Sequence, residues 1–169
     1  MNSQIYLSPH FKLVEFTASA TARNHGIDNT PPAEAVESLQ ALCIHTLEPL
    51  REALSLPIVI TSGYRCRALN QLMVQCSRKS QHMNGQAADF YVDWNGPASE
   101  QPSHRALLVK AFRQIILDER IDFDQCIIYP SFIHVSYVNG GFANRRRITR
   151  GFSNGTYAAL TRAQALSLE

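Results

Sequence analysis

Two short apolar runs in the last third of the chain, separated by a proline and a serine, constrain the fold most strongly. Residues 126–129 and 132–137 each have the length and the β-branched or aromatic content of a strand, and Pro130 and Ser131 stand between them. Such a pattern predicts a β-hairpin, and therefore an antiparallel sheet. In the second run Ile133 points to one face of the sheet and His134 to the other, because side chains alternate along a strand.

Segments with helical and strand periodicity alternate along the rest of the chain. Thr30 and the two prolines after it are typical of a helix start, and apolar residues then recur at helical spacing until the chain approaches Pro57. The pattern also predicts strands over 57–61 and 87–93, a short helix over 67–73, a loop over 95–103 and a helix after Ser103. Strands and helices in this order predict an α+β fold with a central antiparallel sheet.

The size and composition of the chain suit one small domain. With 169 residues, of which 45% are hydrophobic and 18% charged, the chain can form a core and is not disordered. We therefore predict a single domain over residues 1–169, with an irregular N-terminal arm at residues 1–29. Apolar side chains of that arm, such as Phe11 and Phe16, would anchor it to the domain.

Charge and hydropathy exclude two classes of partner. The net charge is only +2, which gives no reason to expect nucleic acid as a partner, and the basic run Arg145 to Arg147 is expected to be a solvated loop. The chain shows no secretory signal pattern and no run near the roughly 18 apolar residues of a membrane span. We expect a monomer that is synthesised in the cytoplasm and does not enter a membrane.

The segment over residues 80–89 carries the strongest chemical signal. It places His82 before a turn that contains Gly85, and Asp89 on the strand that follows. Imidazole and carboxylate are both good zinc ligands, and glycine would allow a positive φ in the turn between them. Two protein ligands are too few for a catalytic zinc site, so a third should exist.

His134 is the best candidate for that third ligand. It lies between β-branched residues on the predicted hairpin, which would hold its ring firmly. Taken alone, such a histidine is more often a core residue with protein partners, but the segment that contains His82 and Asp89 favours His134 as a ligand. The remaining histidines are more typical of surface or capping positions. No Cys-x-x-Cys pair exists, and Cys66 and Cys76 could form a disulfide only in an oxidising setting.

Several motifs in order resemble one known family. Residues 60–65, Asn70, residues 80–89 and residues 133–136 look like the ordered motifs of the LAS-type zinc peptidases, which include D-alanyl-D-alanine carboxypeptidases and L-alanyl-D-glutamate endopeptidases. The resemblance is closest to a carboxypeptidase-like branch associated with phages and prophages, and it runs from about residue 7 to about residue 140. It implies a small α+β domain with zinc on a central antiparallel sheet and helices packed on one side, a fold shared with the Hedgehog signalling domain.

The resemblance also implies roles for particular residues. Three zinc ligands are implied, in agreement with the direct interpretation: His82, Asp89 and His134. Arg65 would bind a substrate carbonyl or carboxylate, for which a fixed planar cation is well suited, although such an arginine can also merely stabilise a turn. Three residues would support the site or contact the substrate: Ser80, Gln81 and Tyr64.

The expected general base is missing from the motif. Family members usually carry a Glu or Asp three residues before the last histidine ligand, where this chain has Ser131, and many members of the closer branch have a Glu at about Tyr129. Asp124 is the best remaining candidate base, although it could instead cap the strand. The Gly-Gly that often precedes the histidine motif is replaced by Gln75 and Cys76.

From these residues we expect a zinc metallopeptidase of the carboxypeptidase or endopeptidase type. Its substrate would be the peptide stem or cross-link of bacterial peptidoglycan, and a prophage-derived enzyme of the endolysin kind would act at the cell wall after release. The alternative is a zinc-bearing component that binds the cell wall or serves as a phage structural part without catalysing hydrolysis.

Overall fold

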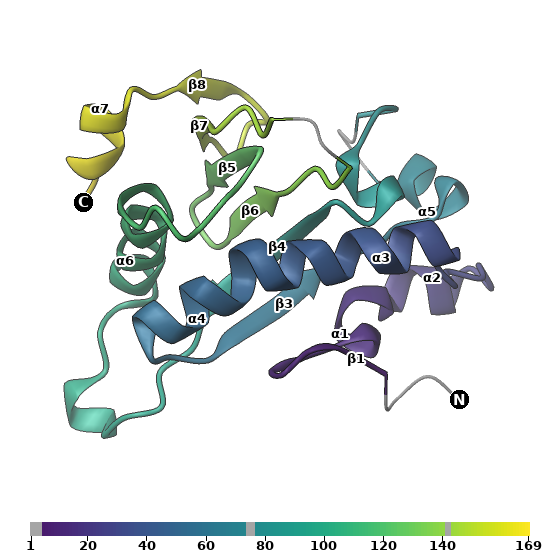
Figure 1. Cartoon of the computed structure of the whole chain (residues 1–169), viewed down its shortest axis with the longest axis horizontal. Coiled ribbons are helices and arrows are strands. Elements are labelled where there is room, and N and C mark those ends of the chain that lie inside the picture. Colours follow the sequence, from purple (N-terminus) through teal and green to yellow (C-terminus); the bar gives the residue numbers. More distant parts are fainter. Residues whose placement is uncertain (1–4, 74–76, 141–142) are drawn as a thin grey trace.

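A computed structural model describes residues 5–73, 77–140 and 143–169 (Figure 1). The described chain forms one α+β domain built on a six-stranded sheet, with a two-stranded ladder beside it. None of the helices in these residues combines the length and the apolar character that crossing a membrane requires.

The large sheet has the strand order β3-β4-β6-β5-β7-β8. Its strands are β3 (Ile58–Ser62), β4 (Ala87–Val92), β5 (Gln125–Ile128), β6 (Ile133–Ser136), β7 (Arg147–Gly151) and β8 (Tyr157–Ala159). The first four strands in this order pair antiparallel, and the predicted hairpin is β5 and β6. The prediction of an antiparallel sheet holds for these four strands, but β7 adds to β5 in parallel.

Helices cover one face of this sheet. The apolar run after Thr30 forms one continuous rod of α3 (Ala33–Leu42), the π-turn η1 (Cys43–Leu47) and α4 (Glu48–Leu54). The rod begins after Pro32 because a residue that precedes a proline is disfavoured in the helical conformation. The widened turn η1 ends two residues before Pro49, which cannot donate the backbone hydrogen bond of a regular helix.

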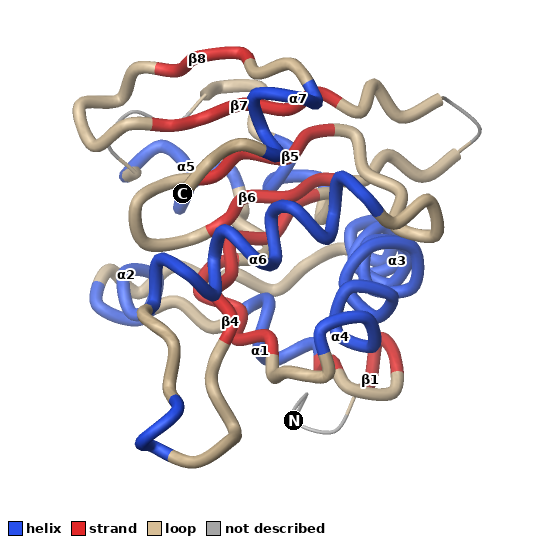
Figure 2. The backbone as a smooth tube through the Cα atoms, turned by 90° about the vertical axis from the view of Figure 1, so that its left-hand side faces the viewer, coloured by secondary structure: helices blue, strands red, loops and turns tan. Residues whose placement is uncertain are grey.

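A second long helix, α6 (His104–Leu117), begins at Ser103, whose side chain caps it as predicted, and lies against β4 and β5 (Figure 2). Three shorter helices and turns lie between the strands: α5 (Arg67–Leu72), η2 (Gln81–Asn84) and η3 (Ala98–Glu100).

The sheet therefore has two different faces. Ala88, Phe90 and Val135 point toward the helices and belong to the hydrophobic core. Asp89 and His134 alternate with them and point to the other face. The predicted placement of helices on one side is confirmed, and it leaves the opposite face open for polar side chains.

The N-terminal segment is more regular than predicted. The prediction of an irregular arm at residues 1–29 is wrong for the described part, which contains β1 (Tyr6–Ser8), β2 (Phe11–Lys12), α1 (Leu13–Thr17) and α2 (Ala20–Asn24). Phe11 and Phe16 are fully buried and meet edge to face, with ring centroids 6.1 Å apart. Burial of these anchors gives the short elements a fixed place against the core.

The prediction of a solvated loop for the basic run near the C-terminus holds for Arg145 and Arg146, which are exposed and outside regular structure, but it is wrong for Arg147. Arg147 is the first residue of β7, and the segment continues through β8 into α7 (Arg162–Leu166). Backbone hydrogen bonds hold this segment, including one from Arg147 N to the carbonyl oxygen of Asp124 at 2.9 Å. The helix α7 contacts α6, which fixes the end of the chain on the domain.

Candidate metal centre

The turn η2 and two neighbouring strands bring the three predicted ligands together. His82 lies in η2 and is 2% exposed, and Gly85 ends this turn with a φ of +68°, as the sequence predicts. A side chain at Gly85 would also collide with the backbone of Ala35. Asp89 on β4 and His134 on β6 are direct partners in the sheet, so their side chains project side by side toward His82.

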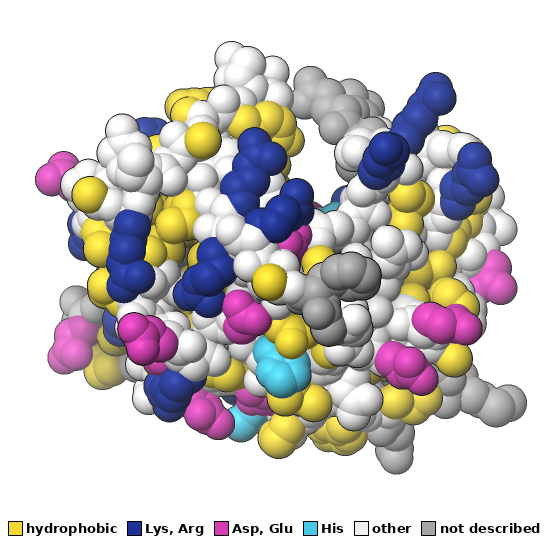
Figure 3. All heavy atoms as spheres, turned by 45° about the horizontal axis from the view of Figure 1, so that its top comes forward, with side chains coloured by type: hydrophobic (Ala, Val, Ile, Leu, Met, Phe, Trp, Pro, Cys, Tyr) yellow, Lys and Arg dark blue, Asp and Glu magenta, His cyan; other side chains and the backbone are white. Residues whose placement is uncertain are grey.

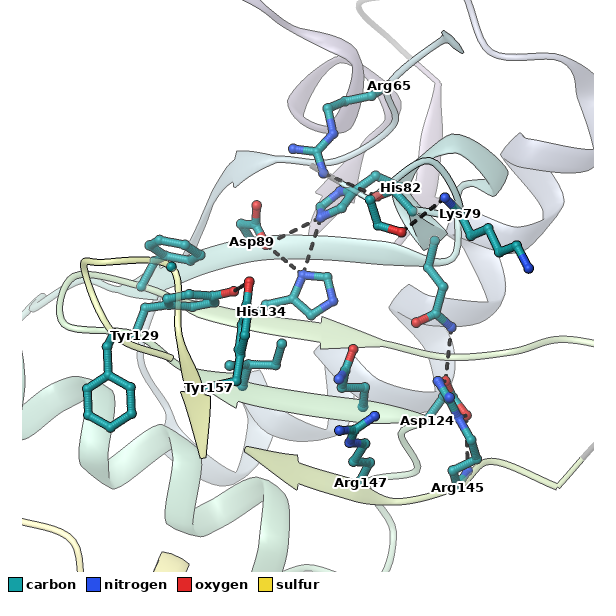
Figure 4. Close-up of a pocket in the computed structure, with 18 of the residues that line it drawn as sticks. Arg65, Lys79, His82, Asp89, Asp124, Tyr129, His134, Arg145, Arg147 and Tyr157 are labelled. Atoms are coloured by element: carbon teal, nitrogen blue, oxygen red, sulfur yellow. Dashed lines mark hydrogen bonds and ion pairs between the residues drawn. The ribbon is translucent and has the colours of Figure 1, made fainter. Parts of the chain in front are cut away.

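The spacing of the ligand atoms fits one zinc ion. Nε2 of His82 lies 3.3 Å from Nδ1 of His134 and 3.4 Å from Oδ1 of Asp89, and the remaining pair is 2.8 Å apart. Donors bound tetrahedrally at about 2.0–2.1 Å from zinc lie about 3.3 Å from one another. The group His82, Asp89 and His134 could therefore hold a metal with little rearrangement (Figure 4).

Hydrogen bonding fixes which nitrogen of His82 faces the site. Nδ1 lies 2.6 Å from the carbonyl oxygen of Gly63, which can only accept, so Nδ1 carries the proton and donates. In the neutral ring Nε2 is then an unprotonated acceptor that faces another acceptor, the Asp89 carboxylate. Two lone pairs facing each other at 3.4 Å call for a cation between them.

The protonation states also suit metal binding. Burial lowers the pKa of His82, which keeps its ring neutral. Burial of Asp89 opposes its ionisation, but the two neighbouring histidines outweigh this effect and lower the pKa of the carboxyl group. Neutral imidazole and ionised carboxylate are the forms that coordinate zinc.

Arg65 projects over His82 and Asp89 from the loop after β3 (Figure 4). Its backbone N donates to the carbonyl of His82 at 3.2 Å, and its guanidinium makes long hydrogen bonds of 3.4 Å to Ser62 and Ser80. Nε of Arg65 is buried and has no partner among the described residues. The guanidinium thus retains donors for a ligand, and Ser80 supports it.

Asn29 holds the loop that carries Arg65, a role that the sequence does not predict. Its side-chain NH₂ donates to the carbonyls of Thr17 and Tyr64 at 3.0 Å each, and its oxygen accepts from Cys66 N at 2.8 Å. Only a short polar side chain at a turn signals such a role, and that is too common to identify a particular residue.

Tyr64 differs from the prediction of a substrate contact. The side chain is 7% exposed and packs in the hydrophobic core, outside the cleft around the ligands. The reason is geometric: the loop after β3 directs the side chain of Arg65 toward the sheet, and it directs the side chain of Tyr64 into the core. Tyr64 supports the site only through its backbone carbonyl.

Asp124 does not have the surroundings of a general base. Its Oδ1 accepts from the backbone N of Arg145 at 3.0 Å and from Nε at 2.9 Å, and its Oδ2 accepts from Nη2 of the same arginine and from Gln81 at 3.0 Å. These hydrogen bonds, above all those from the Arg145 side chain, lower the pKa of Asp124. A carboxylate saturated by four donors has no free lone pair directed at a water, so its prediction as the base is replaced by a structural role.

Tyr129, which stands about where the resemblance to the closer branch implies a glutamate, pairs with Tyr157. The hydroxyl of Tyr129 donates to that of Tyr157 at 3.0 Å, and the Tyr129 ring stacks on Phe132. Two carboxylates lie on the described part of the cleft wall, those of Asp89 and Asp124. Each is already engaged, the first by two histidines and the second by Arg145 and Gln81.

The other histidines have protein partners that explain them. His10 bonds Glu48 at 2.7 Å, His104 donates to the carbonyl of Ser131 at 2.8 Å, and His45 stacks on Tyr137. The possible pairing of Cys66 with Cys76, and the altered Gln75–Cys76 position, lie outside the described residues.

The ligand group lies in a cleft of about 940 Å³ on the open face of the sheet. Comparison with protein families gives a match to the family described as Peptidase M15, over residues 9–136, which is well over half of the chain. The chain belongs to the peptidase M15 family. The resemblance to LAS-type zinc peptidases is thereby confirmed. No curated protein matches the sequence.

Membership makes the chain a metallopeptidase by family, and peptidases of this family are generally zinc-dependent. The match includes all three residues of the candidate metal centre and ends at Ser136, the last residue of β6. The strands β7 and β8 and the turn between them lie beyond it, yet this segment supplies several residues of the cleft wall: Arg147, Phe152, Ser153, Gly155 and Tyr157.

Proposed function

We propose that this protein is a zinc peptidase that hydrolyses an amide bond in the peptide stem or cross-link of bacterial peptidoglycan. The observation that carries the proposal is the convergence of His82, Asp89 and His134 at zinc-ligand spacing. Membership of the M15 family supports the peptidase chemistry. The finer assignment, to a carboxypeptidase-like enzyme of phage or prophage origin that reaches the wall after release, rests on the sequence motifs.

The chain's own residues divide the work of hydrolysis. Zinc at this site would polarise the scissile carbonyl and lower the pKa of a bound water to roughly 7. The carbonyl of Gly63 keeps His82 oriented and neutral, so that Nε2 is available as a ligand. Arg65 offers free guanidinium donors above the ligands, where they can hold a developing oxyanion or a substrate carboxylate.

A second function is favoured by one observation. Both carboxylates on the described wall of the cleft are engaged, and neither is placed as a free base. A zinc-bearing domain without an efficient base would bind wall peptides but turn them over slowly. This alternative keeps the same site and predicts binding without hydrolysis.

One experiment separates the two functions. The zinc-loaded protein is incubated with purified peptidoglycan, with His134→Ala as the control, and soluble products are identified by mass spectrometry. Release of a free D-amino acid indicates a carboxypeptidase, and release of cross-linked fragments indicates an endopeptidase. Binding of the wall with no product beyond the control rejects the peptidase proposal in favour of the binding function.

A further inference from the structure

The three consecutive arginines after the family match have different partners. Arg145 pairs with Asp124 through its guanidinium, and Arg146 reaches Asp122 at 3.1 Å while it lies over the ring of Phe123. Within the residues that the structure describes, no acidic side chain pairs with Arg147. Among the described residues, the guanidinium of the third arginine is therefore not engaged by a carboxylate.

Strand pairing fixes Arg147 on the wall of the cleft. Arg147 is the first residue of β7 and is the register partner of Gln125 on β5, which is itself paired with Ser136 on β6. The backbone N of Arg147 donates to the carbonyl of Asp124, so the ion pair of Asp124 and Arg145 anchors the start of β7. Figure 4 shows the Arg147 side chain pointing into the cleft, on the far side of His134 from Arg65.

The described residues of the cleft provide no counterion for this cation. Asp89 faces the two histidines and Asp124 is neutralised by Arg145, whereas Arg65, Lys79 and Arg147 also line the cleft. Figure 3 shows basic side chains gathered around the hollow on this face. A ligand that enters the cleft thus meets excess positive charge on both sides of the candidate metal centre.

We propose that Arg147 is a specificity-determining residue that binds a carboxylate of the peptide substrate. Arg147 lies two strands and two residues from His134, so their Cα atoms are about 12 Å apart for strands about 4.8 Å apart with a rise of about 3.3 Å per residue. This span corresponds to about three or four residues of extended peptide. The ligand is a peptide with a carboxylate at that distance from the scissile amide, and a planar guanidinium can bind it through two hydrogen bonds.

The inference rests on the proposed function, because peptidoglycan stems contain such a group. A glutamate joined through its γ-carboxyl leaves its α-carboxylate free, and amidation of that carboxylate removes the charge with almost no change in shape. Two synthetic stem peptides, L-Ala-γ-D-Glu-L-Lys-D-Ala-D-Ala and its α-amide, are therefore matched probes.

The test compares both peptides on the zinc-loaded full chain, on Arg147→Gln and on Arg150→Gln. Arg150 is a matched control because it lies on the same strand, three residues further on, and is not itself a residue of the cleft wall, although its guanidinium packs on Phe152, which is. Affinity is measured as Kd by calorimetry, and as KM separately from kcat where the peptides are cut. We expect the wild type and Arg150→Gln to bind the acid peptide at least about tenfold more tightly than its α-amide. In Arg147→Gln this preference should be lost.

The outcomes separate this inference from the proposed function. Equal affinity of the wild type for both peptides, retention of the preference in Arg147→Gln, or its equal loss in Arg150→Gln each overturns the role of Arg147. A preference that depends on Arg147, with neither peptide cut, supports the carboxylate site and counts against the peptidase proposal alone.

Discussion

Asp89, which is partly exposed, and Asp124, which is buried, both lie in the wall of one cleft and have a lowered pKa, yet their surroundings give them opposite roles. Asp89 faces nitrogen atoms of two histidines, and the Nε2 of His82 carries no proton because Nδ1 donates to Gly63. Asp124 faces a guanidinium, a backbone NH and a side-chain amide, all of which donate to it. The first arrangement lacks a cation and the second already contains one.

The comparison shows that burial and pKa do not by themselves identify a reactive carboxylate. A low pKa reports that the ionised form is stabilised, and it does not tell whether hydrogen-bond donors or a metal site provide the stabilisation. The partners decide this. We therefore place the chemistry at Asp89 and assign to Asp124 the anchoring of the segment that carries Arg147.

The largest effect is expected at the region of Asp89. His134→Ala removes one of three protein ligands, and we expect it to abolish retention of zinc after dialysis and all hydrolysis that depends on zinc. His45→Ala is the control, since His45 stacks on Tyr137 away from the ligands. Elemental analysis of the purified variants is the measurement. Equal zinc in both variants would remove the region of Asp89 from metal binding and end the contrast with Asp124.

The next effect concerns the cation above this region. Arg65→Ala should keep zinc and lower turnover about 10²–10³-fold, because one oxyanion donor is lost. Arg65→Lys should restore part of the rate, since lysine has the charge but not the planar fork. Arg67→Ala, exposed at the start of α5, should leave turnover unchanged. Full turnover in Arg65→Ala at matched zinc content would show that Arg65 only stabilises its loop.

The sequence predicts the region of Asp89 well because its signals are local. A histidine, a glycine turn and an alternating strand lie within a few residues, and the strand partner His134 is marked by its own alternation. The pair formed by Asp124 and Arg145 depends on a parallel pairing of β5 with β7 that spans some twenty residues, and no local pattern encodes that contact. The strands β1 and β2 are missed for a related reason, since strands of two and three residues are too short to show a period.

A smaller effect is expected from the partner of His82. A Cβ at Gly63 would lie 2.6 Å from backbone atoms of Phe16, so Gly63→Ala should displace the carbonyl that orients the His82 ring. Loss of such an orienting hydrogen bond typically lowers metal affinity about 10–100-fold. Zinc affinity is measured by competition with a chelator, and thermal unfolding of the zinc-free protein separately reports any general loss of stability. Unchanged zinc affinity in a variant that is merely less stable would mean that the ring is held in another way.

The smallest effect on chemistry is expected at Asp124, and it tests the other side of the comparison. Asp124→Asn should lower the free energy of unfolding by about 2 kcal/mol, because a charged acceptor of several hydrogen bonds is lost, while turnover per folded molecule should fall only a few-fold. If Asp124 were the general base, turnover would instead fall about 10²–10⁴-fold.

The pKa of Asp124 is lowered in the folded protein, so the contribution of this carboxylate to stability is complete above the unfolded value of about 3.9 and is lost as the pH falls below that value. The stability difference between wild type and Asp124→Asn should therefore be largest near neutral pH and shrink in acid, as measured by denaturant unfolding at several pH values. Asp118→Asn, which removes an arginine-paired carboxylate outside the cleft, is the control for the loss of an ion pair as such. A large fall in turnover with unchanged stability in Asp124→Asn would reverse the assignment and return Asp124 to the catalytic machinery.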